Sequence, residues 1–160
     1  MRACDEALAA VIATPAGQRT FTNMFEALES AVDVIAQVEG SYGFMAYVSD
    51  NDALRETARE WEQRLSKYAV ELAFREDLYS AIKEYEESAE AQALAGEEKR
   101  LLDRTMLDYR RNGFGLPKEH REQVQQLMNR LVELGTDFRK AIDTWDDGIL
   151  CTREELAGMP

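Results

Sequence analysis

Apolar residues recur at intervals of three and four along most of this chain, which is the spacing of one face of an α-helix. Two runs are long enough to organise a fold. The first consists of Leu54, Ala58, Trp61, Leu65, Tyr68 and Leu72. The second consists of Val124, Leu127, Leu131, Leu134, Phe138, Ile142 and Trp145. We therefore predict two long antiparallel helices near residues 53–73 and 118–145, with Trp145 packed on the apolar face that Phe138 and Ile142 share.

Weaker runs at the same spacing predict shorter helices on either side of the first long one. They cover residues 3–13, residues 24–48, a segment from residue 78 that becomes polar over residues 86–95, and residues 97–111. Asn23 and Glu26 have the spacing of a capping box for the second of these, and residues 49–52 form a turn and N-cap cluster. Because turn-forming residues are sparse and the 3.6-residue period is strong, we predict an all-α fold, a bundle of long antiparallel helices.

The C-terminal segment has the start signal of a helix that the chain does not complete. Asp146-Asp147-Gly148 ends the last long helix, and residues 149–151 read as extended. Thr152 and Glu155 then form a capping-box pattern with only five residues after Glu155. We expect residues 1–160 to be a single helical domain and a fragment of a longer protein.

Composition excludes several classes of partner. The chain has 160 residues with 31 acidic and 19 basic side chains, a net charge of −12. This charge repels nucleic-acid phosphates and anionic lipid, so we expect no nucleic-acid and no membrane partner. The apolar run at residues 7–13 is short and follows Asp5 and Glu6, unlike the basic start of a secretory signal. We therefore expect a cytoplasmic protein.

Few side chains are suited to catalysis or to metal binding. The single histidine, His120, cannot supply the two-histidine helix of a zinc peptidase, and its charged surroundings predict a solvated position. Cys4 and Cys151 could form one disulfide, although two unpaired thiols fit a cytoplasmic protein better. We assign no catalytic, cofactor-binding or metal-binding residue, and we expect the isolated chain to hold no cofactor and to have no enzymatic activity.

One segment partly matches the sequence pattern of a calcium-binding loop. Residues 143–154 match its pattern at Asp143, Asp147, Gly148 and Glu154, but Trp145 stands at the third position and offers no oxygen. A helix end followed by an Asp-Asp-Gly turn explains the segment better, and calcium sensing stays a distant alternative.

Short sequence motifs resemble, in the same order, those of the N-terminal helical region of the thimet oligopeptidase and neurolysin family of zinc oligopeptidases. Arg19-Thr20-Phe21-Thr22-Asn23, followed by Ala27-Leu28-Glu29, is similar to the family's "TFEN…ALE" opening, and residues 108–117 are similar to its "DFRRNG…LP". The remaining motifs lie at residues 48–49, 54–55, 62–66, 75–79, 101–105, 131–138 and 152–160.

The resemblance implies a non-catalytic domain that forms part of the wall of a channel admitting short peptides. It also implies that zinc, its HExxH helix and the hydrolytic chemistry belong to a part of the parent that this chain lacks. The partners implied are that missing catalytic part and short peptides. We further expect an apolar surface, with Leu156 and Met159 at its end, that is exposed when the catalytic part is absent and supports a homodimer. The alternative is a self-sufficient acidic helical module that binds a partner protein.

Overall fold

The computed structural model describes residues 1–158, and every regular element in that range is helical. The all-α prediction is therefore confirmed. In chain order the elements are α1 (Arg2–Ala13), η1 (Ala16–Gln18), η2 (Thr22–Glu26), α2 (Ala27–Val38), η3 (Glu39–Gly43), α3 (Met45–Val48), α4 (Asp52–Ala73), α5 (Glu76–Glu86), α6 (Ala89–Ala93), α7 (Gly96–Arg111) and α8 (Lys118–Asp143).

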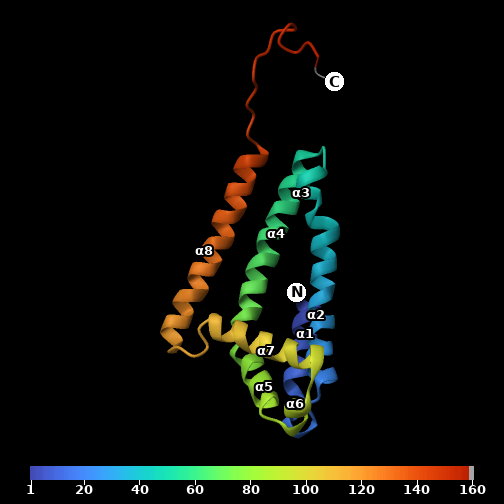
Figure 1. Cartoon of the computed structure of the whole chain (residues 1–160), viewed down its shortest axis with the longest axis vertical. Coiled ribbons are helices and arrows are strands. Elements are labelled where there is room, and N and C mark those ends of the chain that lie inside the picture. Colours follow the sequence, from blue (N-terminus) through green and yellow to red (C-terminus); the bar gives the residue numbers. More distant parts are fainter. Residues whose placement is uncertain (159–160) are drawn as a thin grey trace.

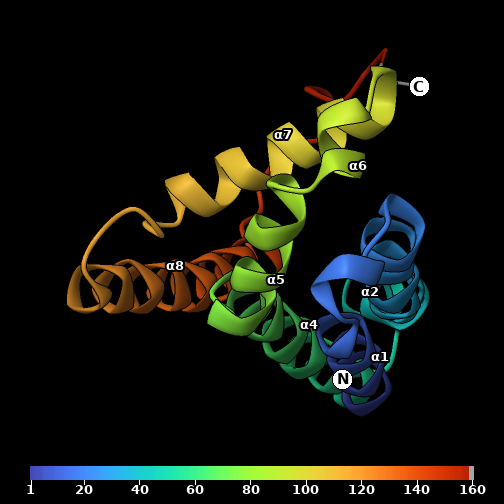
Figure 2. The same cartoon turned by 90° about the horizontal axis from the view of Figure 1, so that it is seen from below.

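Three long rods stand side by side in the molecule (Figure 1). The central rod is α4, and it runs antiparallel both to α8 and to the continuous arm formed by η2, α2, η3 and α3. Helix α4 packs against α3 on one side and α8 on the other, and α5, α6 and α7 gather at one end (Figures 1 and 2). The two predicted long helices, near residues 53–73 and 118–145, are thus confirmed as α4 and α8.

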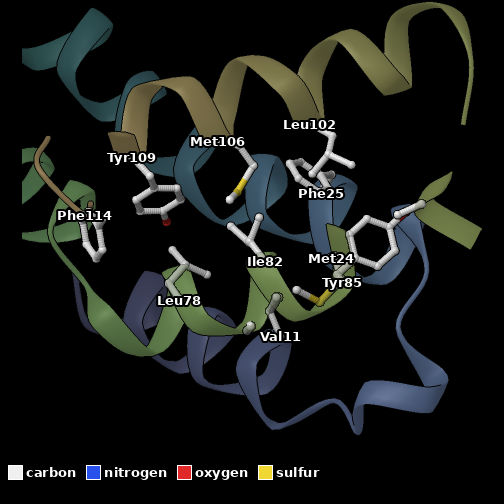
Figure 3. Close-up of a cluster of buried hydrophobic side chains, with 12 residues drawn as sticks. Val11, Met24, Phe25, Leu78, Ile82, Tyr85, Leu102, Met106, Tyr109 and Phe114 are labelled. Carbon is white, nitrogen blue, oxygen red and sulfur yellow. The ribbon is translucent and has the colours of Figure 1, made fainter. Parts of the chain in front are cut away.

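The main core lies where α5 and α7 meet η2 and the end of α1 (Figure 3). Phe25 is stacked on Phe21, with ring centroids 5.2 Å apart, and its ring is tilted against that of Tyr85 at 6.0 Å. The buried members of this cluster are Val11, Met24, Phe25, Leu78, Ala81, Ile82, Tyr85, Ala91, Leu102, Met106, Tyr109 and Phe114.

A smaller buried cluster joins α1 to α2 and α4. Cys4 and Leu8 of α1 pack there with Ala31 and Tyr68. The Tyr68 hydroxyl donates a hydrogen bond to the Asp5 carboxylate at 2.7 Å. Burial and this bond raise the pKa of Tyr68 above its ordinary value. Cys4 is buried and Cys151 is exposed, and both are free thiols as the sequence suggested.

The capping box predicted between Asn23 and Glu26 is wrong, because Asn23 pairs with Thr20 instead. The backbone N–H of Thr20 donates to Asn23 Oδ1 at 2.8 Å, and the N–H of Asn23 donates to Thr20 Oγ1 at 3.3 Å. Asn23 already lies within the first π-helical turn, so its side chain reaches back to Thr20 instead of forward to Glu26. The cap predicted within residues 49–52 is confirmed, because Asn51 Oδ1 accepts from the N–H of Leu54 at 3.1 Å.

The C-terminal segment follows its predicted pattern up to the last described residues. The N–H of Thr152 donates to the Glu155 carboxylate at 2.7 Å, and the N–H of Glu155 donates to Thr152 Oγ1 at 3.3 Å. Turns and no regular helix follow over residues 153–158, and Leu156 is exposed. Met159 lies outside the described residues.

The packing predicted for Trp145 is wrong. Helix α8 ends at Asp143, two residues earlier than Trp145, and the indole is 75% exposed. The apolar face that Trp145 extends points away from α4, so no neighbouring helix within residues 1–158 covers it.

We therefore expect Trp145→Ala to change the free energy of unfolding of this chain by less than about 0.5 kcal/mol. Urea denaturation followed by circular dichroism measures this, since the signal does not depend on the indole. A loss above about 2 kcal/mol would show that Trp145 has a packing partner, and a rise in stability with added calcium would revive the calcium-loop alternative.

Candidate interaction surface

Helices α4 and α8 meet along a face that is largely charged on each, and Met128 and Val132, next to Asn129 and Glu133, are also half-buried there. The contact, which we call the ionic seam, contains four ion pairs between residues 56–67 of α4 and residues 133–143 of α8. They are Lys67–Glu133 at 2.8 Å, Glu62–Arg139 at 2.8 Å, Glu56–Lys140 at 2.8 Å and Arg59–Asp143 at 3.3 Å. The Asp143 that would begin a calcium loop is therefore engaged by Arg59.

Two carboxylates of the seam titrate below their ordinary range. The hydrogen bond from Lys140 lowers the pKa of Glu56, and the hydrogen bonds from Lys67 and Arg130 lower the pKa of Glu133. A carboxylate whose folded pKa is depressed stabilises the fold fully above its unfolded pKa of about 4.3 and loses that contribution as the pH falls through the folded value.

We accordingly expect α8 to separate from α4 in acid before the main core unfolds. Spin labels on Ala69→Cys and Gln126→Cys, in a Cys151→Ser background, report the distance between the two helices. The distance should widen between about pH 5 and about pH 3, and also in about 1 M salt at neutral pH, since screening weakens exposed ion pairs. A distance that stays fixed until the whole chain unfolds would contradict this expectation.

Glu62 is the one charged residue of this seam that is buried, at 9% exposure. The Tyr47 hydroxyl from α3 lies 3.0 Å and 2.9 Å from its two carboxylate oxygens, and Arg139 from α8 lies at 2.8 Å. Burial is the main cause that raises the pKa of Tyr47, followed by its hydrogen bond to Glu62. This carboxylate connects the arm, α4 and α8.

The opposite side of α8 carries the apolar stripe found in the sequence. We call this surface the α8 apolar face, and its side chains are 47–67% exposed. Its members are Leu127, Leu131, Leu134, Phe138 and Ile142. At its end Phe138, Ala141, Ile142 and Trp145 surround a shallow hollow of about 290 Å³.

A second apolar surface lies between the arm and α4. A pocket of about 340 Å³ opens there next to Gly43 and Glu62. Its apolar lining consists of Val38, Tyr42, Met45, Leu54, Ala58, Trp61 and Leu65. The apolar stripe of α4 is therefore only partly covered by the arm, which leaves Leu54 and Trp61 about half exposed.

The side chains that could bind a metal are dispersed. His120 is exposed in the first turn of α8, as predicted, while Cys4 is buried in α1 and Cys151 lies beyond α8. Within residues 1–158, no three His, Cys, Asp or Glu side chains form a group that could hold a metal ion. In the same range, no helix is both long enough and apolar enough to cross a membrane.

Sequence reasoning missed Glu62 and the ionic seam. A signal was present, because Glu62 lies between Ala58 and Leu65 at spacings of four and three, on the buried face of α4. A carboxylate at such a position requires a partner. Which basic residue supplies it depends on the fold and could not be read from the pattern.

Comparison with known proteins identifies relatives over the whole chain. A sequence model of the N-terminal domain of the neurolysin/thimet oligopeptidase family matches residues 4–121. The thimet-like oligopeptidase of Dictyostelium discoideum is 32% identical over 164 aligned positions, which cover 100% of this chain and 24% of that protein. Oligopeptidase A of Escherichia coli is 27% identical, with 98% of this chain and 23% of that protein covered. The chain thus spans about a quarter of the length of these curated relatives.

Proposed function

The chain belongs to the neurolysin/thimet oligopeptidase family, whose N-terminal domain it matches, and from this we propose a function. We propose that the chain forms part of the wall of the peptide-access channel of a zinc-dependent oligopeptidase. The observation that carries this proposal is the match of the N-terminal domain model over residues 4–121. In this proposal residues 1–160 are one helical domain that contributes shape to the enzyme and no catalytic residue.

The long rods of the fold support a role as a wall. Helix α4 has 22 residues and α8 has 26, so at 1.5 Å per residue they extend about 33 Å and about 39 Å. A barrier of this size, stiffened by helix packing, restricts which substrates can approach a recessed site. Short peptides would pass such a barrier, whereas folded proteins and unfolded chains of protein length, whose coils are wider than the barrier, would not.

The residues of this chain do not fit a catalytic zinc ion. Such a site needs three protein ligands and an open position, and the one histidine, His120, is solvent-exposed and stands apart from both thiols. The zinc and the hydrolytic step of the proposed enzyme therefore belong to the polypeptide that corresponds to the uncovered three quarters of the relatives. A cytoplasmic location is part of the proposal, since the Arabidopsis thaliana relative is named a probable cytosolic oligopeptidase A.

A chimera tests the proposal. Residues 1–160 would replace the aligned quarter of the Dictyostelium thimet-like oligopeptidase. We expect this chimera to hydrolyse a short fluorogenic peptide with zinc-dependent activity and to spare denatured casein. We expect the 160-residue chain alone to hydrolyse neither substrate.

Two results would count against it. Hydrolysis of casein and the short peptide at similar rates would contradict the wall, and peptide hydrolysis by the isolated chain that a chelator abolishes would show an overlooked site. A soluble, folded chimera without activity would favour the alternative, a self-sufficient acidic interaction module. The pocket between the arm and α4 is the observation that keeps this alternative open.

A further inference from the structure

Helix α8 is the longest helix of the described chain and contributes no buried residue to it. Soluble helices of this length normally bury an apolar stripe against a neighbour. Helix α8 differs from this, because the ionic seam faces α4 and the apolar face points away from it.

The geometry of a helix separates the two faces. A step of two residues turns an α-helix by about 200°. Leu127, Leu131, Leu134 and Phe138 each stand two residues before Asn129, Glu133, Thr136 and Lys140. Glu133 and Lys140 form ion pairs with α4, and a side-chain atom of Asn129 is fully buried. Arg139 and Asp143, which also pair with α4, stand only one residue after Phe138 and Ile142, a turn of about 100°. The apolar face therefore lies on the side of α8 that is turned away from α4.

The shape of this face fits another helix. Its residues follow spacings of four, three, four and four from Leu127 to Ile142, the pattern of a helix-pairing seam. Gly135 borders the face, and a methyl group built at its Cα would meet no atom within 4 Å. The open space beside Gly135 lets a second backbone approach closely.

The comparisons indicate where the covering helix comes from. The match to the N-terminal domain model ends at residue 121, within the first turn of α8. The alignment with the Dictyostelium relative nevertheless continues over the whole chain, which covers only 24% of that protein. Helix α8 is thus shared with the oligopeptidases and lies at the limit of the domain, next to what the remaining three quarters encode.

We propose that the α8 apolar face is the docking surface for an amphipathic helix from the polypeptide that corresponds to those three quarters. This inference rests on the proposed function, since it requires the chain to be joined to such a polypeptide. A helix in the same polypeptide is present at high effective concentration. A second copy of this chain is disfavoured, because each copy carries a net charge of −12 and the two repel.

Thiol accessibility tests the surface directly. The variant Leu131→Cys, in a Cys151→Ser background, places a thiol on the apolar face. The matched control is Gln126→Cys, also exposed but about 100° around the helix from Leu127. Each variant is made in the 160-residue chain and in the chimera described above, and the rate of reaction with a maleimide is measured.

We expect the thiol at position 131 to react at least tenfold more slowly in the chimera than in the chain alone, and the thiol at position 126 to change less than twofold. Equal rates at position 131 in an active chimera would overturn the docking surface and leave the proposed function standing. Protection at position 131 in an inactive chimera would support the docking surface and remove the proposed function. Protection in the chain alone that increases with its concentration would assign the surface to a second copy instead.

A second measurement applies if the chimera is insoluble. The 160-residue chain is produced together with the remaining part of the Dictyostelium protein, which carries an affinity tag, and the retained chain is quantified. The double variant Leu131→Glu, Phe138→Glu should reduce retention at least tenfold, whereas Gln126→Glu should not. Equal retention of the double variant, or no retention of the unaltered chain, would overturn the proposal.

Discussion

Phe25→Ala is expected to lower the free energy of unfolding by about 3–5 kcal/mol, the largest effect of any single truncation argued from this fold. The ring is 1% exposed and lies in the main core, stacked on Phe21 and tilted against Tyr85. Its removal leaves a cavity between η2 and α5 that the surrounding helices can only partly fill. Urea denaturation followed by circular dichroism at 222 nm measures the change.

Phe138→Ala is the matched control, because the residue and the substitution are the same and only the environment differs. The Phe138 ring is 67% exposed on the α8 apolar face. Alanine also has a higher helix propensity than phenylalanine by a few tenths of a kcal/mol, so the stability should stay level or rise slightly. Similar losses at both positions would mean that the apolar face of α8 is buried in the free chain, by self-association or by another packing of α8.

The contrast between Phe25 and Phe138 also marks what the sequence could predict. Both residues lie on stripes with spacings of three and four, and both stripes were correctly assigned to helices. Periodicity identifies the apolar side of a helix, but not whether the described chain supplies a partner for that side. The stripe of α8 has no such partner within residues 1–158, and for this reason the predicted burial of Trp145 was wrong.

Polar contacts were predictable only when they were local. The caps at Asn51 and at Thr152 and Glu155 depend on residues three positions apart, and both appear in the structure. The seam between α4 and α8 joins residues that are 66 to 84 positions apart, so the pairing is fixed by the fold. The assignment of Asn23 to a cap with Glu26 failed because a π-helical turn moved the start of the helix.

The motifs that pointed to the family lie at positions that hold the fold together. The Asn112 amide donates to the Ala73 carbonyl at 3.3 Å, which fixes the end of α7 to the end of α4. Gly113 adopts a φ of 89°, a left-handed conformation that favours glycine, and this turn places Phe114 against Tyr79 and Tyr109. These motifs are therefore signals of a shared fold.

Arg19, the first residue of the motif at residues 19–23, is the site of the second large expected effect on the free energy of unfolding. Its side chain is 8% exposed and reaches from the turn after η1 to two backbone carbonyls. Nε donates to the Thr14 carbonyl at 3.0 Å, and Nη1 donates to the Ala81 carbonyl at 3.1 Å. The same Nη1 pairs with the Glu84 carboxylate at 2.5 Å. The guanidinium thereby joins the end of α1 to α5, across 62 residues of sequence in its contact with Ala81.

Arg19→Ala is expected to lower the free energy of unfolding by about 2–3 kcal/mol, since hydrogen bonds from a charged donor are lost and the Thr14 carbonyl is left without this partner. Arg2→Ala is the control, because Arg2 is 94% exposed and its pair with Glu6 spans 3.8 Å, so its loss should cost less than about 0.5 kcal/mol. Arg19→Lys separates the causes in the same denaturation measurement. A lysine keeps the attraction to Glu84, which is itself more than half exposed, but lacks the fork that reaches both carbonyls. Arg19→Lys should therefore lose most of what Arg19→Ala loses, and full stability in the lysine variant would assign the effect to charge alone.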